Sequence, residues 1–352
     1  MAKNRTSGSK ILVIRLSAMG DVAMTVPVLF ALTKQYPQIK ITVLTRGFFK
    51  PMFNALPKVE VFVADVNGRH RGFIGLWKLY QELKKQNFDG VADLHNVLRS
   101  NILKLFFGLG RIPFVQMDKG RMEKKALTSA RDKIFKPLKT THRRYADVFA
   151  QLGYPVKLTD ENVLPKRSLG SKIRNILECS NKILIGIAPF AAFGGKRYPL
   201  YLMEEVIATL NKVNAYGLIL FGGGPAERAQ LEKWSNGYEN CINLAGRVSF
   251  DEELDVISNL QLMLSMDSGN AHLAAMYGVP TVTLWGVTHP FAGFYPFAQD
   301  PNNALLSDRN KFPLIPTSIY GNKFPDGYEN AMETIRPKDV VAKIEEVLDR
   351  RL

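Results

Sequence analysis

Short apolar runs alternate with amphipathic stretches along the chain. In the first half, four runs rich in β-branched residues predict buried strands at residues 11–16, 39–45, 58–64 and 88–94. Apolar positions at helical spacing predict helices over residues 22–36 and 73–86, and Pro37 ends the first of them. Because strands and helices alternate, we expect a parallel α/β sheet.

The second half repeats this pattern after an aperiodic stretch at residues 158–171. A chain of 352 residues is longer than one core usually accommodates. We therefore predict two Rossmann-like parallel-sheet domains facing a central cleft, formed by residues 1–165 and 166–335. The helix in residues 336–352 is a candidate for packing back on the first domain.

Four polar or glycine-rich loops follow predicted strands, at residues 17–21, 189–199, 222–227 and 267–272. Ligands of open parallel sheets bind beyond the carboxyl ends of the strands. If the two domains face each other, these loops converge on one cleft, where we expect the substrates.

The turn Asp267-Ser268-Gly269 lies where a buried strand gives way to a short apolar helix that also carries His272. Unpaired amides at a helix N-terminus can hold a phosphate, and Ser and Gly let a ligand approach the backbone. The alternative is that Asp267 or Ser268 simply caps the helix. For His272, the alternative to a ligand contact is a place in the core.

Several familiar motifs are missing from the sequence. It contains no Asp-x-Asp, no P-loop motif and no Cys/His cluster, which disfavours a metal-dependent nucleotide-sugar site and a P-loop nucleotidase. Glu227 stands where a dinucleotide fingerprint needs its third glycine, which disfavours a dinucleotide reductase. A diphosphate leaving group then needs fixed cations, and Lys196 and Arg197 are candidates. The alternative for Lys196 is an ordinary surface lysine.

Carboxylates stand at two predicted helix starts. Asp21, just after the first strand, is a candidate general base toward an acceptor hydroxyl. Glu227 is a candidate partner of ribose hydroxyls. For both, a favourable interaction with the helix dipole is the alternative. Thr288 and His289 follow a late strand and are candidates for substrate contact.

The net charge of +15 is concentrated in the first half, where residues 1–165 hold 28 Lys or Arg against 12 Asp or Glu. The densest part runs from Lys119 to Arg144 and has ten basic and two acidic residues. Such a field attracts an anionic membrane, a phosphorylated acceptor or nucleic acid, and a solvated basic face is the alternative.

The sequence suggests a cytoplasmic protein. No run of about 18 apolar residues appears, and the polar residues 1–10 lack the apolar region of a signal peptide. Cys179 and Cys241 form no metal-ligand pattern and are consistent with a reducing compartment.

An ordered series of motifs resembles bacterial family 9 glycosyltransferases, whose best-known members are ADP-heptose–lipopolysaccharide heptosyltransferases. Arg15-Leu-Ser17-Ala-Met-Gly20-Asp21, with the apolar run before it, resembles the family's opening, and Lys196-Arg197-Tyr198-Pro199 is similar to its Lys-Arg-Trp-Pro segment. Further blocks follow in order at residues 221–227, 243–247, 267–275 and 286–290. The match spans residues 11 to 300.

The resemblance implies a GT-B fold and transfer with inversion at the anomeric carbon, without metal or cofactor. It implies that Asp21 is the catalytic base. The residues that it implies for donor binding are Lys196 at the phosphates, Glu227 at the nucleoside, and Asp267, Ser268, Gly269 and His272 at the diphosphate and sugar. Further candidates for substrate contact are Ser17, Gly20, Arg197, Thr288 and His289.

Three departures from the family pattern limit what carries over. Tyr198 replaces the usual Trp, and Gly222-Gly-Gly-Pro225 leaves the nucleotide open. Many relatives carry paired cysteines before the C-terminal helix, but the segment from Pro313 to Ile335 has none. The acceptor region of the first domain shows no diagnostic match.

The sequence therefore predicts an inverting glycosyltransferase that moves a sugar, heptose before others, onto a lipopolysaccharide-core-type acceptor. ADP-heptose is the expected donor, the acceptor is a lipid-anchored anionic saccharide, and the enzyme would touch the anionic inner face of the cytoplasmic membrane. One alternative keeps the fold with another nucleotide sugar. The other is a non-enzymatic polyanion-binding protein that uses the segment from Lys119 to Arg144. That segment lacks the aromatics of a single-strand platform, so nucleic acid is not expected.

Overall fold

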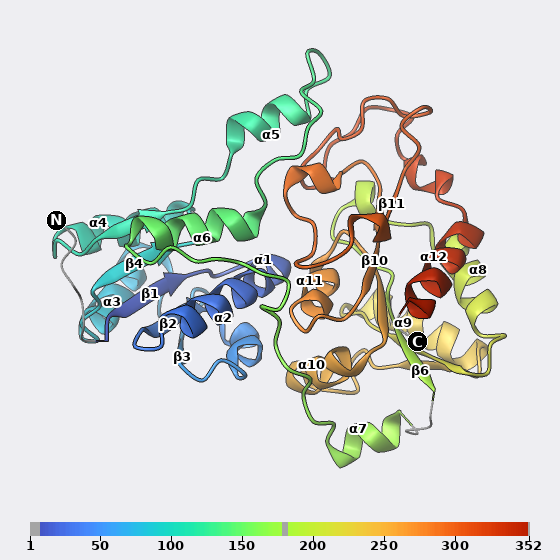
Figure 1. Cartoon of the computed structure of the whole chain (residues 1–352), viewed down its shortest axis with the longest axis horizontal. Helices are drawn as coiled ribbons and strands as arrows, with labels where there is room; N and C mark the ends of the chain where they lie inside the picture. The colour runs from blue at the N-terminus through green and yellow to red at the C-terminus, as the bar shows by residue number, and fades with distance from the viewer. Residues whose placement is uncertain (1–7, 178–181, 351–352) are drawn as a thin grey trace. The chain divides into compact units, whose positions relative to one another are not determined.

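A computed structural model describes residues 8–177 and 182–350. The chain forms two units, one made of the residues up to Lys119 together with Lys139–Leu164, the other of Gly120–Leu138 and Pro165–Leu352. Each unit contains one sheet whose paired strands all run parallel, and Figure 1 shows helices on the faces of both sheets. The predicted α/β class with two parallel sheets is confirmed.

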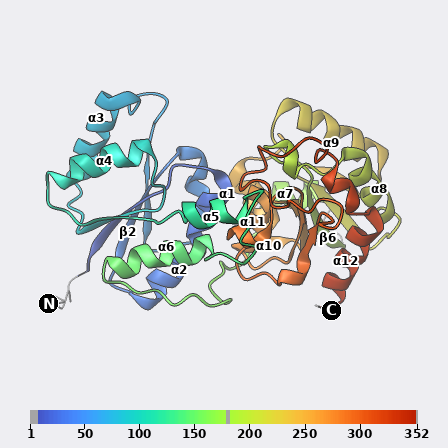
Figure 2. The same cartoon turned by 90° about the horizontal axis from the view of Figure 1, so that it is seen from above.

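The first unit is built around a sheet with the strand order β3-β2-β1-β4-β5. Its strands are β1 (Lys10–Ile14), β2 (Lys40–Thr45), β3 (Val59–Val63), β4 (Gly90–Asp93) and β5 (Phe114–Gln116). The central strand β1 pairs with β2 on one side and β4 on the other, and helices cover both faces of the sheet (Figure 2), so its apolar residues are buried. The carboxyl end of β1 therefore lies at the centre of the edge formed by the carboxyl ends of the five strands.

Two pairs of helices cover this sheet. They are α2 (Thr25–Gln35) with α6 (Thr141–Gln151), and α3 (Gly72–Lys84) with α4 (Leu98–Gly108). The short α1 (Met19–Ala23) and the 3₁₀ helix η1 (Gly47–Phe53) follow β1 and β2. Figure 2 shows α3 and α4 side by side on one side of the sheet, with α2 and α6 on the other.

The helix predicted over residues 22–36 is divided in two. Helix α1 ends at Ala23 and α2 begins at Thr25. Pro27 lies in the first turn of α2, and a proline has no N–H to donate to the carbonyl of Ala23. The break separates α1, which carries Asp21, from the longer α2.

The second unit contains a sheet with the strand order β11-β10-β9-β6-β7-β8. Its strands are β6 (Ile183–Ala188), β7 (Tyr216–Leu220), β8 (Cys241–Asn243), β9 (Leu262–Met266), β10 (Thr281–Trp285) and β11 (Ala304–Leu306). Its helices are α5 (Arg121–Leu127), α7 (Ser171–Ile176), α8 (Leu200–Leu210), α9 (Pro225–Gly237), α10 (Phe250–Asn259), α11 (Gly269–Ala275) and α12 (Pro337–Asp349). The 3₁₀ helices are η2 (Gly194–Lys196), η3 (Pro290–Ala292), η4 (Pro301–Asn303) and η5 (Ala331–Thr334).

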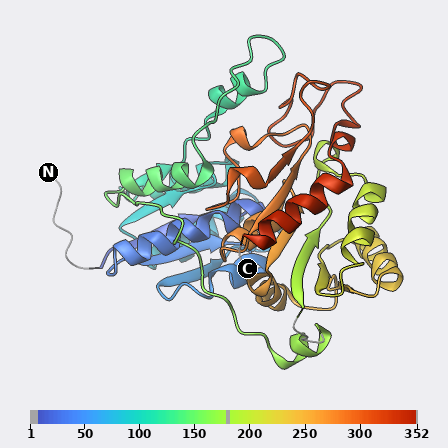
Figure 3. The same ribbon diagram turned by 45° about the vertical axis from the view of Figure 1, so that its right-hand side comes forward.

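The C-terminal helix α12 lies against α8 and β9 of the second unit, and Figure 3 shows it in red beside the yellow-green α8. Val340, Ile344 and Val347 belong to the same apolar core as the strands β6, β7 and β9. The structure thus differs from the expected packing on the first domain. The apolar stripe of α12 is already buried within its own unit.

The segment Gly120–Leu138, predicted in the first domain, belongs to the second unit. The Leu138 N–H donates to the Phe291 carbonyl, and the Arg309 guanidinium lies 3.6 Å from the Phe135 ring centre. Lys133 Nζ donates to the carbonyl of Pro316 at 2.8 Å. The basic stretch from Lys119 to Arg144 is therefore divided between the two units.

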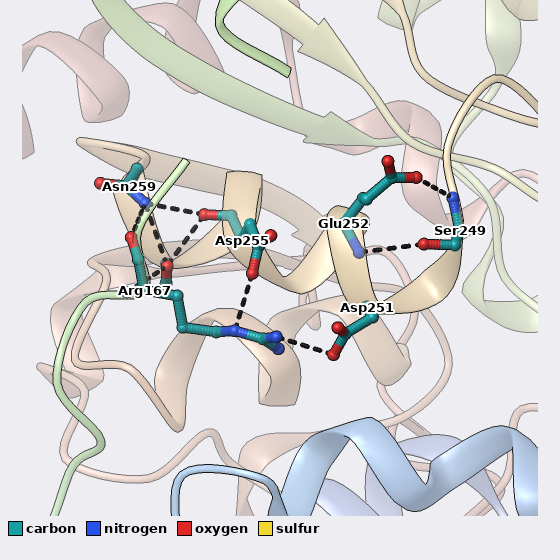
Figure 4. Close-up of polar contacts among 7 residues, drawn as sticks. Arg167, Ser249, Asp251, Glu252, Asp255 and Asn259 are labelled. Atoms are coloured by element: carbon teal, nitrogen blue, oxygen red, sulfur yellow. Dashed lines mark hydrogen bonds and ion pairs between the residues drawn. The ribbon is translucent and has the colours of Figure 1, made fainter. Parts of the chain in front are cut away.

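Arg167, in the aperiodic stretch, ties the start of the second unit to α10. Its backbone N–H donates to Ser258 Oγ at 3.0 Å, and its carbonyl accepts from Asn259 Nδ2 at 2.8 Å. Its guanidinium binds Asp251 at 2.7 Å and Asp255 at 2.8 Å (Figure 4). The stretch has no periodic pattern because its order comes from these contacts and not from regular structure.

Candidate functional site

The first group of functional side chains lies at the carboxyl end of β1. Asp21 is in the first turn of α1, and its Oδ2 lies 2.5 Å from Arg15 Nη2. The other terminal nitrogen of Arg15 donates to the Leu94 carbonyl at 2.6 Å. Arg15 is only 6% exposed, and its guanidinium is held by the Asp21 carboxylate and the Leu94 carbonyl. It holds the Asp21 carboxylate beside a permanent positive charge.

Tyr145 of α6 completes the support of this pair. Its ring centre lies 6.0 Å from the Arg15 guanidinium carbon, and its hydroxyl donates to the Asp21 carbonyl at 3.3 Å. Burial raises the pKa of the Tyr145 hydroxyl, so it stays protonated and remains a donor. Side chain and backbone of Asp21 are therefore both held.

His95, at the end of β4, adds a neutral imidazole to the same region. Burial, together with the nearby charges of Arg15, Lys119 and Arg46, lowers the pKa of His95 to about 3. Asp93 orders this loop by accepting hydrogen bonds from the backbone N–H groups of His95 and Asn96, both at 2.9 Å. The sheet edge around Asp21 thus has an excess of cationic side chains.

Ser17 and Gly20 flank this arrangement. Ser17 lies in the turn between β1 and α1, and Gly20 lies in the first turn of α1. The turn backbone also contacts Asp21, because the Ala18 N–H donates to its Oδ2 at 3.4 Å. The turn backbone therefore helps to hold the Asp21 carboxylate.

The second group lies at the carboxyl ends of β9 and β10 in the other unit. Lys196 Nζ is 2.7 Å from Asp267 Oδ2, and Thr288 Oγ1 donates to the same oxygen at 2.9 Å. The Lys196 side chain is 15% exposed and that of Asp267 is 7% exposed. The surface-lysine alternative for Lys196 is therefore wrong. Asp267 and Thr288 orient the ammonium group, which still has further donors to offer.

Close backbone packing positions Lys196. The Gly195 N–H donates to the Gly321 carbonyl, and the Gly195 carbonyl accepts from Val287 N–H. A Cβ at Gly195 would lie 2.4 Å from Val287 Cγ2 and 2.7 Å from the Gly321 oxygen, so only glycine fits. A Cβ at Gly321 would lie 2.6 Å from Lys196 Cγ. Because Gly195 and Gly321 have no side chains, the aliphatic part of Lys196 has the space it needs to reach Asp267.

The turn before α11 is not capped by a side chain in the way the alternative interpretation proposed. Ser268 occupies the N-cap position without a side-chain cap bond, and its hydroxyl lies 3.1 Å from Ser265 Oγ. The Asp267 carboxylate is engaged by Lys196 and Thr288. Gly269 begins the helix, and His272 is buried within it. Because neither side chain satisfies the helix amides, these donors remain at the turn.

Glu227 and Arg197 lie in two neighbouring loops of the second unit. Glu227, in the first turn of α9, accepts a hydrogen bond from Gly223 N–H at 2.8 Å and thereby orders the glycine loop after β7. Arg197 donates to the carbonyls of Ala191 and Ala192 at 2.9 and 3.1 Å. Both residues shape the loops in which the sequence placed them.

Tyr198 and His289 have internal partners. Tyr198, in place of the family's Trp, is buried and donates its hydroxyl to the Ile335 carbonyl at 2.7 Å. His289 Nδ1 accepts from Phe291 N–H at 3.1 Å, and its ring packs edge-on against Phe135. Burial, with the charge of Arg309, lowers the pKa of His289 to about 4. His289 is thus a neutral support for the segment Gly120–Leu138.

Arg15 belongs to a motif that the sequence shows, but no local pattern assigned it a role. Tyr145 was not predicted as a site residue. A signal for Arg15 exists, since it is the one charge between two apolar residues of a buried run. Its partner Leu94 lies 79 residues away in sequence, which no local pattern indicates.

Three further observations concern metal, thiol and membrane chemistry. Within residues 8–177 and 182–350, no three His, Cys, Asp or Glu side chains are grouped as metal ligands would be. Cys241 is buried, and burial raises the pKa of its thiol to about 12, whereas Cys179 lies outside the described residues. No helix in the described part is both long and apolar enough to span a bilayer.

Comparisons with known proteins agree with one another. The family model for glycosyltransferase family 9 (heptosyltransferase) matches residues 76–314. Lipopolysaccharide heptosyltransferase 2 of Salmonella typhimurium is 29% identical over 361 residues, covering 96% of this chain and 98% of the relative.

Two solved structures share the fold over nearly the whole chain. A family 9 glycosyl transferase from Veillonella parvula has a TM-score of 0.74 at 20% identity, covering 98% of both chains. The E. coli heptosyltransferase WaaC with ADP-2-deoxy-2-fluoro heptose has a TM-score of 0.67 at 18% identity, covering 96% of this chain and 99% of that one.

Proposed function

We propose, since the chain belongs to glycosyltransferase family 9 (heptosyltransferase), that it transfers heptose from ADP-heptose to a lipopolysaccharide-core-type acceptor. Its enzyme class and its GT-B fold, both predicted from the sequence, are confirmed by the family match and by the structures that share the fold. The non-enzymatic alternative is not favoured, because the family match is to glycosyltransferases. The observation that carries the proposal is the buried cluster of Lys196, Asp267 and Thr288.

This cluster suits the diphosphate of a nucleotide sugar. Lys196 offers a fixed ammonium group, and the backbone amides of the turn before α11, which no side chain caps, follow directly after Asp267 in sequence. Glu227, in the first turn of α9, is the proposed partner of the nucleoside's ribose hydroxyls. The relative solved with an ADP-heptose analogue favours adenosine diphosphate as the nucleotide. His272 and Ser268 complete the proposed donor residues.

Asp21 acts as the general base in this proposal. It takes the proton of the acceptor hydroxyl, whose oxygen forms a bond to the anomeric carbon while the bond from that carbon to the diphosphate oxygen breaks. A single displacement inverts the configuration at that carbon. Arg15 keeps the carboxylate oriented. Lys196 stabilises the negative charge that develops on the departing diphosphate.

We propose that transfer needs no metal ion. A fixed ammonium group and backbone amides supply the charge stabilisation that a divalent cation supplies in other sugar transferases. Activity is therefore expected to be unchanged by EDTA. Loss of activity in EDTA that Mg²⁺ or Mn²⁺ restores would contradict this part of the proposal.

The first unit is proposed to bind the acceptor. Lys119 and Arg46 influence His95 electrostatically and give this sheet edge a positive field suited to a lipid-anchored anionic saccharide. Ser17 and Gly20, beside the proposed base, are candidates for substrate contact in the first unit. Arg197, Thr288 and His289 are the corresponding candidates in the second unit. The acceptor's lipid anchor implies that the enzyme works at the cytoplasmic face of an anionic membrane.

The test is a transfer assay with purified protein and a soluble, deacylated lipopolysaccharide-core acceptor. ADP-heptose, UDP-glucose and GDP-mannose are each supplied, and the product is identified by its mass. We expect a heptose adduct from ADP-heptose. NMR should show that the anomeric configuration of the transferred heptose in the product is opposite to its configuration in the donor. Preferential transfer from UDP-glucose or GDP-mannose would instead establish the different-donor alternative, and retention of configuration would overturn the mechanism.

A further inference from the structure

The outer surface of α3 and α4 carries apolar side chains that the core of the first unit does not use. We name this surface the α3–α4 face, and its exposed apolar residues are Phe73, Ile74, Trp77, Leu98, Leu105 and Leu109. Between 41% and 76% of each residue is accessible to solvent. Single exposed leucines are ordinary, but a contiguous group indicates an interaction site.

The spacing of these residues makes the group contiguous. Leu98, Leu105 and Leu109 recur at intervals that return to one side of a helix, so they form a stripe along α4. Phe73 and Trp77 lie one turn apart on α3, and both rings pack edge-on against Phe106 of α4, at 5.4 and 5.0 Å. Phe106 therefore joins the two helices into one apolar surface.

The opposite sides of α3 and α4 pack into the core of the first unit. Leu76, Leu79 and Leu83 of α3 and Leu103 and Phe107 of α4 are buried in the core of the first unit. The exposed residues are thus a second apolar face on helices that already have one. Folding of the unit alone gives no reason for that second face.

Cationic side chains surround the face, and carboxylates are nearly absent from it. The exposed basic residues on or beside the two helices are Arg71, Lys78, Lys84, Lys85, Arg99, Lys104 and Arg111. Glu82 is the sole carboxylate on α3 and α4, and it is held by Arg69 at 2.7 Å. The field at this surface is therefore positive.

We propose that the α3–α4 face is the surface by which this protein docks on an anionic phospholipid bilayer. Leucine and aromatic side chains would enter the boundary between headgroups and acyl chains, while the lysines and arginines reach anionic headgroups. The inference rests on the proposed function in one respect, since a lipid-anchored acceptor gives docking its purpose.

Other occupants fit this surface less well. A second copy in a two-fold dimer would set this face against itself and bring the same cations together. Cores of protein interfaces are depleted of lysine, whereas amphipathic membrane helices are rich in it. The segment Gly120–Leu138 is also basic, but its exposed large apolar residues are only Met122 and Ile134.

The chain contains its own probe of this docking. Trp77 is the only partly exposed tryptophan of three, because Trp234 and Trp285 are buried at 0% and 1%. Tryptophan fluorescence is measured while vesicles of phosphatidylcholine, with or without phosphatidylglycerol, are added to the full chain. We expect a blue shift only with phosphatidylglycerol, and quenching by brominated acyl chains. Vesicle binding without a change in Trp77 emission would mean that another surface docks, and would overturn the proposal.

Two matched variants test the apolar contribution. Leu105→Ser with Leu109→Ser is expected to weaken vesicle partitioning at least about tenfold in a flotation assay. Met122→Ser with Ile134→Ser, which removes the two exposed large apolar side chains of the segment Gly120–Leu138, is expected to leave it unchanged. Equal losses in both double variants, or a loss only in the second, would overturn the proposal. A blue shift that grows with protein concentration without vesicles would assign the face to a second copy.

Activity on two acceptors separates this inference from the proposed function. The Leu105→Ser, Leu109→Ser variant is expected to transfer heptose to the soluble, deacylated acceptor at the wild-type rate, and to the vesicle-embedded acceptor at least about tenfold more slowly. If the wild-type protein shows the blue shift of Trp77 on vesicles but transfers no heptose to either acceptor, the proposed function is refuted and the docking proposal stands. Equal rates of both proteins on embedded acceptor would refute the docking alone.

Discussion

The buried Arg15 guanidinium lies 2.5 Å from the Asp21 carboxylate, so a fixed cation orients the proposed base before any substrate binds. An amide at position 21 keeps the shape of the side chain but cannot accept the proton. Asp21→Asn is therefore expected to lower kcat by about 10²- to 10⁴-fold, with the affinity for ADP unchanged. Steady-state kinetics and calorimetry measure the two effects.

The matched control for this change is Glu60→Gln, which alters an exposed carboxylate on β3 of the same unit. It is expected to keep the wild-type kcat. Near-normal turnover of Asp21→Asn would remove Asp21 from its role as base.

Replacing Arg15 tests whether orientation of Asp21 matters. Arg15→Lys keeps a charge but cannot reach Asp21 and the Leu94 carbonyl with two separate nitrogens. We expect kcat to fall about tenfold in Arg15→Lys and about 100-fold in Arg15→Met, with KM for the donor little changed. A purely structural role for Arg15 would instead lower stability while kcat per folded molecule stayed constant. Thermal denaturation beside the kinetics distinguishes these outcomes.

Removing Lys196 is expected to have two separable effects. Lys196→Met should weaken ADP binding about 10- to 100-fold, because a fixed donor to phosphate is lost. It should also destabilise the fold by about 2–4 kcal/mol, because the buried Asp267 carboxylate loses its cation. Adding Asp267→Asn should recover most of the stability but not the ADP affinity.

The exposed Lys233, paired with Glu204 at 3.8 Å, provides the control. Lys233→Met should change neither quantity. Full recovery of ADP affinity in the Lys196→Met, Asp267→Asn double variant would show that Lys196 serves the fold alone.

Arg167 is expected to matter for stability. Arg167→Met removes two ion pairs and leaves the largely buried Asp255 without its partner, which should cost about 2 kcal/mol in chemical denaturation. Lys172→Met removes an exposed pair with Glu252 of the same helix and should cause no measurable change. Equal effects of both variants would contradict the anchoring role of Arg167 shown in Figure 4.

The contribution of His289 to the stability of the second unit is expected to fall in mild acid. His289 has a folded pKa of about 4, below the value of about 6.5 for an unfolded histidine. The unfolded state therefore binds more protons between these values. The His289 contribution to the free energy of unfolding should therefore decrease as the pH falls through this window, by up to about 1.4 kcal/mol per pH unit, while Glu253, whose pKa burial raises to about 7, contributes with the opposite sign.

His289→Asn keeps an acceptor for Phe291 N–H but does not titrate, so it should flatten this dependence. Fluorescence of the buried Trp234 and Trp285 reports unfolding of the second unit. An unchanged slope in His289→Asn would contradict the assignment.

Local patterns predicted much of the fold and supplied the candidate site residues. Strands β1 to β4 overlap the four runs that the sequence predicted as strands, and the helix α10 (Phe250–Asn259) begins with a local signal. Ser249 and Glu252 form a reciprocal capping box at the start of that helix, which is an interaction within four residues of sequence. Such features are readable because helix and strand hydrogen bonds depend on neighbours in sequence.

Only the tertiary structure decided which side chains meet. It joined Arg15 to Leu94, brought Lys196 to Asp267, and buried α12 in the second unit. It also assigned Gly120–Leu138 to the second unit. These outcomes depend on contacts between residues far apart in the chain. The sequence by itself determined the elements and the chemistry available at their ends, because both are local; the partners of Asp21 and Lys196 came from packing, which is not.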